Sequence, residues 1–242
     1  MEIDFVLLWV DCNDIEWQKK KNKYSTDKSM DDSAVRYQSW DNLVYWFRSV
    51  ERYAPWVRKI HFVTCGQIPP WLDPTHPKIH LVNHGDYMPA DALPTFNSNA
   101  IEIGLHKING LSNYFVCFND DMFLTSPIQP EYYYHQGIVR ETPGLTRPIV
   151  PAEGNIFSHL LYNNLEIINQ HFDIKQVLKK DWYNWLNPLL GKTALRTLLN
   201  IRKKEFPGFV MPHLSTPYVK DDFERVWNEE EKVLTQTQYH RF

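Results

Sequence analysis

The sequence predicts an α/β fold in which a mostly parallel sheet flanked by helices is followed by a helical C-terminal half. Over roughly the first half of the chain, apolar runs of strand length alternate with helical patterns, which is typical of a parallel sheet with helices on its faces. An irregular stretch rich in Pro and Tyr then runs from about Pro127 to Glu153, and helical periodicity dominates after it. We therefore expect one part over residues 1–150 and a second over residues 151–242.

The composition is that of an ordinary globular protein. Of the 242 residues, 43% are hydrophobic and 23% are charged, which suffices for a proper core. The net charge of −3 argues against a general nucleic-acid binder. No apolar run approaches the ~20 residues of a membrane span, and the first residues lack the basic segment of a secretory signal. Three widely spaced cysteines favour a reduced, cytoplasmic chain over a disulfide scaffold.

The first elements are an apolar strand and two helices. Ile3–Val10 is an almost continuous apolar run that stops at the polar sequence DCND, as expected of a strand buried on both faces. Asp14 can cap a short polar helix that follows. In SWDNLVYWFRSVERYAPW, apolar residues recur at helical spacing, which predicts a helix with Ser39 or Asp41 as its N-cap and Pro55 as its stop.

Three more strands and a helix complete the α/β part. The runs 58–65 and 78–83 read as strands between Pro-rich turns. Residues 97–110, NSNAIEIGLHKING, predict a helix with Gly110 at its C-terminal cap, and YFVCF at 114–118 predicts the next strand. The helical half is predicted to hold four helices, over residues 157–168, 173–186, 191–204 and 216–234. The last would take Thr216 as its N-cap and Pro217 at its first position.

Two acidic clusters follow predicted strands. Asp11 and Asn13 come after the first strand, and Asp120 and Asp121 interrupt the apolar run VCFNDDMFL. In an open parallel sheet, ligands bind outside the carboxyl ends of the strands. A nucleotide diphosphate bound through Mg²⁺ needs one or two carboxylates at such an edge, and the cation would remove the repulsion between adjacent carboxylates. The alternative is an Asx-turn that ends the strand, and spacing alone favours neither.

One histidine is a candidate general base. His213 lies in the irregular segment GFVMPHLSTPY between two predicted helices, where functional side chains often lie, and imidazole is the usual base near neutral pH. The structural alternative is a histidine that caps the following helix or bonds a backbone carbonyl. The sequence contains no glycine-rich phosphate loop, GxSxG elbow or HExxH motif.

Long blocks of the sequence resemble the Stealth proteins, the bacterial capsular and cell-wall polysaccharide sugar-1-phosphate transferases, which are related to the catalytic subunit of the animal N-acetylglucosamine-1-phosphotransferase. The first two conserved regions are matched by IDFVLLWVDCNDIEW, RYQSWDNLVYWFRSVERYAPWVRKIHFVTCGQIPPWL, LPTFNSNAIE and YFVCFNDDMFL, and the third by FPGFVMPHLSTPYVKDDFERVWNEE and TQTQYHRF. The resemblance covers nearly the whole chain. Family members continue into a fourth, aromatic-rich region, whereas this sequence stops at Phe242.

The resemblance implies a Rossmann-like or GT-A-like sheet and a specific reaction. A UDP-sugar donor would pass its hexose with the attached phosphate to a hydroxyl of a glycan acceptor, releasing UMP and leaving a sugar phosphodiester. Mg²⁺ or Mn²⁺ would be the cofactor. The part over residues 1–150 would bind the nucleotide sugar, and residues 151–242 would form an acceptor or lid part. A lipid-linked acceptor would place the enzyme in the cytoplasm, peripheral to the cytoplasmic face of the membrane.

The same resemblance implies roles for individual residues. The donor-binding residues would be Asp11, Asn13, Arg36, Asn97 and Ser98. Asp120 and Asp121 match the acidic pair near metal and phosphate, His213 matches the general base, and Arg241 matches the arginine of the HRF motif. We expect Arg36 and Arg241 to contact the donor phosphates, because an arginine fork grips two oxygens.

Other interpretations stay open at this point. A GT-A-like metal-dependent glycosyltransferase would use the same acidic pair and release UDP instead of UMP. A non-catalytic carbohydrate-binding module would use Trp and Tyr rings to stack on sugars, but it leaves the acidic strand ends unexplained. A further basic set is either a solvated helix face or a docking site for anionic lipid: Lys192, Arg196, Arg202, Lys203 and Lys204.

Overall fold

The computed structural model describes residues 1–25, 41–150 and 156–242. The chain forms two compact units, one of residues 1–140 together with 214–242, the other of residues 141–213. Residues 214–242 thus pack with the N-terminal part. The functional division at residue 150, into a donor part and an acceptor part, stays a prediction.

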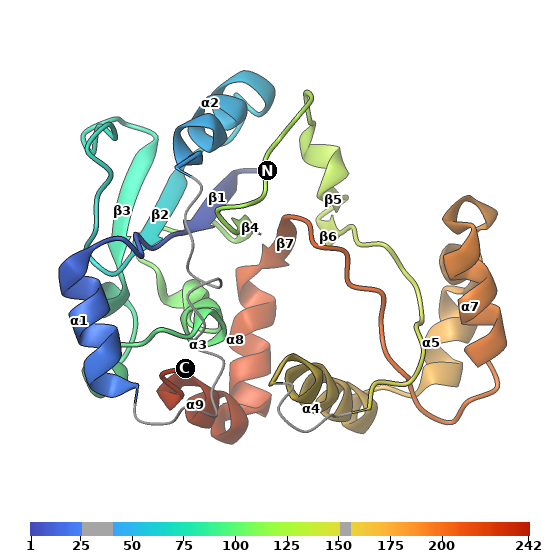
Figure 1. The fold of residues 1–242 in the computed structure, drawn as a ribbon. Coiled ribbons are helices and arrows are strands. Elements are labelled where there is room, and N and C mark those ends of the chain that lie inside the picture. Colours follow the sequence, from blue (N-terminus) through green and yellow to red (C-terminus); the bar gives the residue numbers. More distant parts are fainter. Residues whose placement is uncertain (26–40, 151–155) are drawn as a thin grey trace. The chain divides into compact units, whose positions relative to one another are not determined.

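The first unit is built on a mixed sheet (Figure 1), which confirms the predicted fold class. Its five strands lie in the order β3–β2–β1–β4–β7: β1 (Ile3–Leu8), β2 (Ile60–Thr64), β3 (Ile79–Asn83), β4 (Tyr114–Phe118) and β7 (Thr216–Val219). The first four are mutually parallel, and β7 runs antiparallel to β4 at the edge. The unit also contains a small hairpin, β5 (Tyr134–His135) and β6 (Ile138–Val139).

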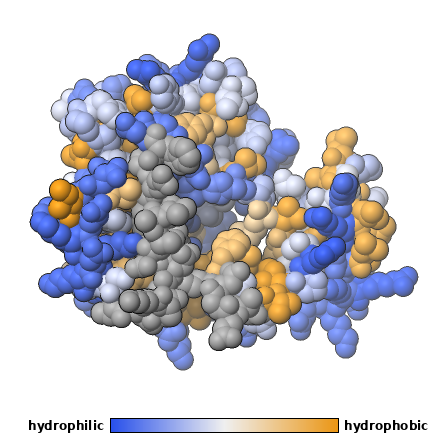
Figure 2. Space-filling view, viewed as in Figure 1, coloured by the Kyte–Doolittle hydropathy of each residue, from blue (hydrophilic) through white to orange (hydrophobic). Residues whose placement is uncertain are grey.

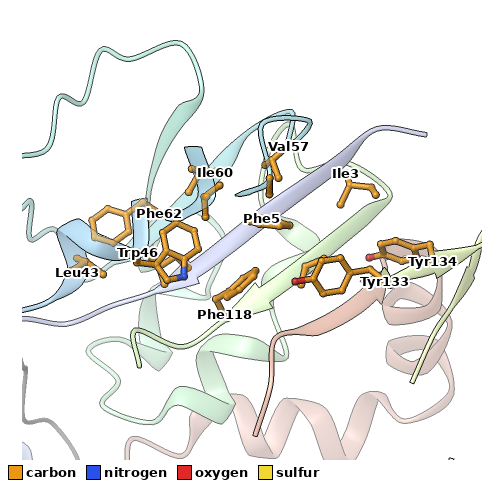
Figure 3. Close-up of a cluster of buried hydrophobic side chains, with 14 residues drawn as sticks. Ile3, Phe5, Leu43, Trp46, Val57, Ile60, Phe62, Phe118, Tyr133 and Tyr134 are labelled. Atoms are coloured by element: carbon orange, nitrogen blue, oxygen red, sulfur yellow. The ribbon is translucent and has the colours of Figure 1, made fainter. Parts of the chain in front are cut away.

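Helices cover both faces of this sheet. The helices of this unit are α1 (Ile15–Tyr24), α2 (Leu43–Tyr53), α3 (Ser98–Glu102), α8 (Lys220–Glu229) and α9 (Glu231–Tyr239), of which α2 packs on one face and α3 and α8 pack on the other. Along β1, Phe5 packs with Trp46 of α2 in one aromatic cluster (Figure 3), whereas Val6 packs on the opposite face with the segment that follows α3. Successive residues of a strand point to opposite faces, so a strand covered on both sides is apolar throughout. The run IDFVLLWV has this pattern.

One buried charge breaks that apolar run. Asp4 is fully buried, and its carboxylate contacts the Arg58 guanidinium through both oxygens. It also accepts the backbone N–H of Lys59 at 3.2 Å and of Ser112 at 2.8 Å, and it lies 2.9 Å from Nε2 of His61. Burial alone would raise the pKa of Asp4, but the contacts with His61, Arg58 and Ser112 outweigh it and hold the pKa below its ordinary value. The charge is thereby compensated.

The second unit is helical, as predicted. It contains α4 (Ile156–His171), α5 (Ile174–Lys180), α6 (Trp182–Trp185) and α7 (Lys192–Asn200). Its separate small core is formed by Leu145, Leu165, Ile174, Leu178 and Phe206. Among the described residues of the whole chain, no helix is long and apolar enough to cross a bilayer.

Of the predictions for individual helix ends, some are confirmed and others are wrong. Asp14 caps α1 by accepting the N–H groups of Glu16 and Trp17, as expected. Asn42, and not Asp41, occupies the N-cap position of α2, while Ser39 lies outside the described residues.

The predicted helix over 97–110 is shorter than expected, because α3 ends at Glu102 and residues 105–107 form a separate 3-10 turn. The helix predicted over 173–186 splits at Asp181, whose φ of −134° is not helical.

The last predicted helix starts later than expected. Thr216 and Pro217 belong to strand β7, which pairs with β4, and α8 begins only at Lys220. Proline is tolerated in an edge strand, where alternate N–H groups have no partner strand. The residues that resembled an N-cap and a first helical position therefore extend the sheet instead.

We predict that Asp4→Asn lowers the free energy of unfolding by roughly 3 kcal/mol, because Arg58 loses the buried carboxylate that pairs with it. Urea denaturation measures the loss. The matched control is Glu2→Gln, which removes an exposed carboxylate 3.7 Å from the same arginine and should change stability by less than about 0.5 kcal/mol. Since folding lowers the pKa of Asp4, the difference should shrink as the pH falls below its ordinary 3.8. Equal losses in both variants would contradict this role.

Candidate functional site

A pocket of about 260 Å³ lies at the carboxyl ends of the four parallel strands. Each of the four contributes residues at or just after its end: Leu8, Trp9 and Val10 from β1, Val63 and Cys65 from β2, His84 from β3, and Asn119, Asp120 and Asp121 from β4. This is the position at which open parallel sheets bind ligands. Asp120 and Asp121 therefore lie at the strand-end position expected from the sequence, and their binding of a ligand stays a prediction.

The acidic pair lies on a turn that ends β4. The turn is closed by Met122, whose N–H donates to the carbonyl oxygen of Asn119 at 3.2 Å. Asp120 is half-buried and Asp121 exposed. Burial, and next the charge of Asp121, raise the pKa of Asp120 to about 6. The turn interpretation and the ligand interpretation are thus compatible, because the turn presents two repelling carboxylates to the pocket.

The residues fit a cation that is shared with a ligand better than a cation enclosed by protein. Within the described part of the chain, no three His, Cys, Asp or Glu side chains are grouped so that they could hold a metal ion. Magnesium commonly uses one or two carboxylates and completes its octahedron with waters and substrate phosphate oxygens. Asp120 and Asp121 would supply the two carboxylates.

Another part of the pocket wall is aromatic. Trp17 of α1 and Phe96 both line it, with ring centroids 5.6 Å apart in an edge arrangement. Ser98, the first residue of α3, and Thr95 line it as well. His84 is buried there, and burial lowers its pKa to about 4, so its imidazole is neutral at physiological pH.

Asp11 and Asn13 lie beside the pocket in a tightly bonded loop. Gln67, after β2, accepts the N–H of Asp11 at 2.7 Å and donates to the carbonyl of Asp11 and the carboxylate of Asp14. The Asp11 carboxylate accepts the N–H of Asn13 at 2.9 Å. Neither residue lines the pocket itself, although Val10 does. Their donor-binding role stays a prediction.

Asn97 and Arg241 connect the C-terminal segment to the pocket wall. Asn97 caps α3 and donates to the carbonyls of His240 and Phe242. The Arg241 guanidinium donates to the carbonyls of Asp91, Ala92 and Pro94, and it lies 5.0 Å from the Tyr24 ring centroid.

These contacts reach the pocket through Phe96. Its N–H donates to the Arg241 carbonyl at 2.7 Å, and its ring stacks on Phe242 at 5.2 Å. Both Asn97 and Arg241 therefore support the loop that carries Thr95, Phe96 and Ser98. Their predicted contact with donor phosphates is untested, and the contacts present are with protein backbone.

The roles of two further predicted site residues, Arg36 and His213, stay predictions. Arg36 lies outside the described residues. His213 is exposed and belongs to the unit of residues 141–213, so its role as general base stays a prediction. In contrast, His84 follows β3 in the sequence KIHLVNH, and the strand-end rule applied to this run would have found it. Trp17 and Phe96 have no such signal, because aromatic residues are common in the core as well.

We predict that Asp120→Asn stabilises the metal-free protein at pH 7 by up to about 3 kcal/mol, since the pKa rises by about 2 units, from 3.8 to about 6, and each unit corresponds to about 1.4 kcal/mol. The sign follows from the raised pKa: ionised Asp120 destabilises the fold increasingly as the pH rises from its ordinary 3.8 to about 6. Denaturant unfolding at several pH values tests this, and the gain should vanish below about pH 4. Asp73→Asn is the control of opposite sign, because Thr75 lowers the pKa of that carboxylate. A stability loss in Asp120→Asn would refute the account.

Arg241→Ala should lower the free energy of unfolding by about 1–3 kcal/mol in the absence of any ligand, because three carbonyls lose a charged donor. Near-ultraviolet circular dichroism should also change, as the Trp17 and Phe96 contact loosens. Arg225→Ala, which removes an exposed arginine paired with Asp222 at 3.1 Å, should leave both measurements almost unchanged. If both measurements on the unliganded Arg241→Ala protein equal those of the wild type, a role of Arg241 in contacting a ligand would be favoured instead.

Comparisons with known proteins place the chain in one family. Residues 1–29 match the family model for Stealth protein conserved region 1, and residues 36–141 match that for conserved region 2. A capsular polysaccharide phosphotransferase of Streptococcus pneumoniae is 36% identical over 244 residues, which cover 100% of this chain and 72% of that protein. An exopolysaccharide phosphotransferase of Lactiplantibacillus plantarum is 38% identical, with 100% and 71% covered. The pocket at the strand ends lies within these matched regions, and the chain belongs to the Stealth family.

Proposed function

We propose that this protein transfers a hexose-1-phosphate from a UDP-sugar to a hydroxyl of a glycan acceptor in the synthesis of capsular or other extracellular polysaccharide. The observation that carries the proposal is the carboxylate pair at the end of β4, in a pocket formed by four parallel strand ends. The relatives support it, since they are named polysaccharide phosphotransferases. The products would be UMP and a sugar phosphodiester.

The two chemically different ends of the pocket suggest how the donor lies. Asp120 and Asp121 are at the β4 end, where a diphosphate would approach the carboxylates through a shared Mg²⁺ or Mn²⁺ ion. Trp17, Phe96 and the neutral His84 form a different surface, which suits the flat and uncharged uracil ring. We place the nucleoside on this aromatic surface and the sugar phosphate beside Asp121.

The protein would contribute to this reaction by positioning the reactants and neutralising charge more than by covalent chemistry. The acceptor oxygen forms a bond to the phosphorus nearer the sugar, the bond from that phosphorus to the bridging oxygen breaks, and UMP leaves with the electron pair. A bound divalent cation would neutralise charge that develops on the phosphate oxygens. Asp120 must be ionised to act as its ligand, so donor binding should strengthen as the pH rises through about 6.

We assign the acceptor proton to His213. The side chain is exposed, in the segment that leads out of the unit of residues 141–213, and a neutral imidazole there could accept the proton of an incoming hydroxyl. Arg36 and the loop of Asp11 and Asn13 would complete the donor site, as the family resemblance implies. The three free cysteines fit a reducing compartment, and we place the reaction in the cytoplasm.

The nearest alternative is a metal-dependent glycosyltransferase, because the same pocket could hold the same donor. The released nucleotide distinguishes the two: a transferred sugar phosphate leaves UMP, and a transferred sugar alone leaves UDP. A non-catalytic sugar-binding module would release neither. Phosphorus NMR of a mixture of protein, UDP-sugars, Mg²⁺ and glycan acceptor therefore decides among all three.

We predict UMP and a new phosphodiester signal in that mixture. His213→Ala should abolish the signal while UDP-sugar affinity stays within about twofold, because the base acts on the acceptor and not on the donor. His159→Ala is the matched control, since His159 is an exposed histidine in the same unit. UDP as the product would overturn the proposed reaction. Wild-type turnover in His213→Ala would overturn only the assignment of the base.

A further inference from the structure

The segment from α5 to α7 carries a strong local positive charge. Residues 174–204 contain eight Lys and Arg side chains but only one acidic residue, Asp181, and so have a net charge of +7 in a chain whose total is −3. Most of this charge lies on exposed positions. The remainder of the protein is therefore strongly acidic, and the segment differs from it in sign.

The same segment exposes large apolar side chains. Leu189 is 92% exposed, Leu199 74% and Trp182 61%. Tyr183, Leu195 and Leu198 are exposed as well. Scattered exposed apolar residues are normal, but a contiguous group marks an interaction surface. Figure 2 shows orange hydrophobic residues mixed with blue hydrophilic ones over this part of the second unit, at the right of the view.

On α7 the apolar and basic side chains share the outward surface. Thr197 is fully buried, and its Oγ1 accepts the N–H of Leu145 at 3.1 Å, which fixes the inward side of the helix. Leu195, Leu198 and Leu199 follow the spacing i, i+3, i+4 and so lie on one exposed stripe. Lys192 and Arg196 are one turn apart beside that stripe. An α-helix in a globular protein normally turns its apolar stripe inward, and here it faces out.

We propose that this basic and apolar face of α7, formed by Lys192, Leu195, Arg196, Leu198 and Leu199, docks on an anionic phospholipid bilayer, with Trp182 and Leu189 exposed in the segment just before it. Helices that lie in a membrane interface combine Lys and Arg with Trp and Leu in this way. The leucines would enter the boundary between headgroups and acyl chains, and the basic residues would contact anionic headgroups. The docking is peripheral and does not depend on the proposed reaction.

Charge decides against a symmetric dimer that is formed through this face. A symmetric dimer through this face would bring the same basic surface of both copies together, and like charges placed opposite each other across an interface are costly. An anionic bilayer supplies both the opposite charge and an apolar layer. It therefore satisfies the two properties of the face at once.

We predict that the full chain floats with vesicles of phosphatidylcholine and phosphatidylglycerol in equal parts, and binds vesicles of phosphatidylcholine alone at least tenfold more weakly. Lys192→Glu/Arg196→Glu should lower binding to the anionic vesicles by at least about 30-fold, since each basic residue contributes roughly fivefold near an anionic surface. Leu195→Ser/Leu199→Ser should lower binding at least about tenfold. Raised salt should weaken the binding of the wild type to the anionic vesicles more than its binding to vesicles of phosphatidylcholine alone.

The control is Lys19→Glu/Lys20→Glu, which makes the same charge change on exposed lysines of α1 in the other unit and should bind like the wild type. Far-ultraviolet circular dichroism verifies that the variants are folded, as expected for exposed positions. Equal binding to both vesicle types, or an equal loss in the control variant, would overturn the proposal. The proposal would also be overturned if light scattering showed the wild type to be a dimer that does not float with the vesicles. In that case Leu195→Ser/Leu199→Ser would convert the dimer to a monomer.

Discussion

The buried carboxylate of Asp4 sets the register of the sheet on which the pocket depends. It joins the start of β1 to Arg58 and Lys59, just before β2, and to Ser112, just before β4. The amino ends of the three central strands are thereby held together, and β1 pairs in parallel with both β2 and β4. Their carboxyl ends meet at one edge, where residues at or just after each strand end line a common pocket.

The carboxylates at the two ends of the sheet differ in whether they have partners that stabilise their charge. At the amino end, Asp4 is buried but supplied with partners, and its pKa is lowered. At the carboxyl end, Asp120 is half-buried beside another carboxylate, and its pKa is raised to about 6. A fold selected for stability alone would not keep such a pair, because ionised carboxylates on adjacent residues repel each other. Destabilising arrangements of this kind concentrate at functional sites, where a ligand relieves them.

The sequence was informative where a single physical rule determines the outcome. Apolar runs predicted β1, β2 and β4 because strands covered on both faces need largely apolar side chains, and the strand-end rule placed Asp120 and Asp121 at the edge where the pocket lies. The prediction that a helix starts at Pro217 was wrong. A proline after a threonine resembles a helix start, and only the pairing with β4 shows that this residue belongs to a strand. The contacts of Arg241 with backbone carbonyls could not be foreseen either, since they depend on a loop 147 or more residues away in the chain.

We propose that Asp120 and Asp121 hold a divalent cation together with a diphosphate, and isothermal titration of UDP with and without Mg²⁺ tests this most directly. We predict that Mg²⁺ tightens UDP binding to the wild-type protein by at least about tenfold, because the two carboxylates would hold the cation beside the diphosphate. In Asp121→Asn this coupling should be lost, with little change in the affinity for UDP alone. UDP affinity that does not depend on Mg²⁺ in the wild type, or an equal Mg²⁺ effect in the variant, would contradict the account.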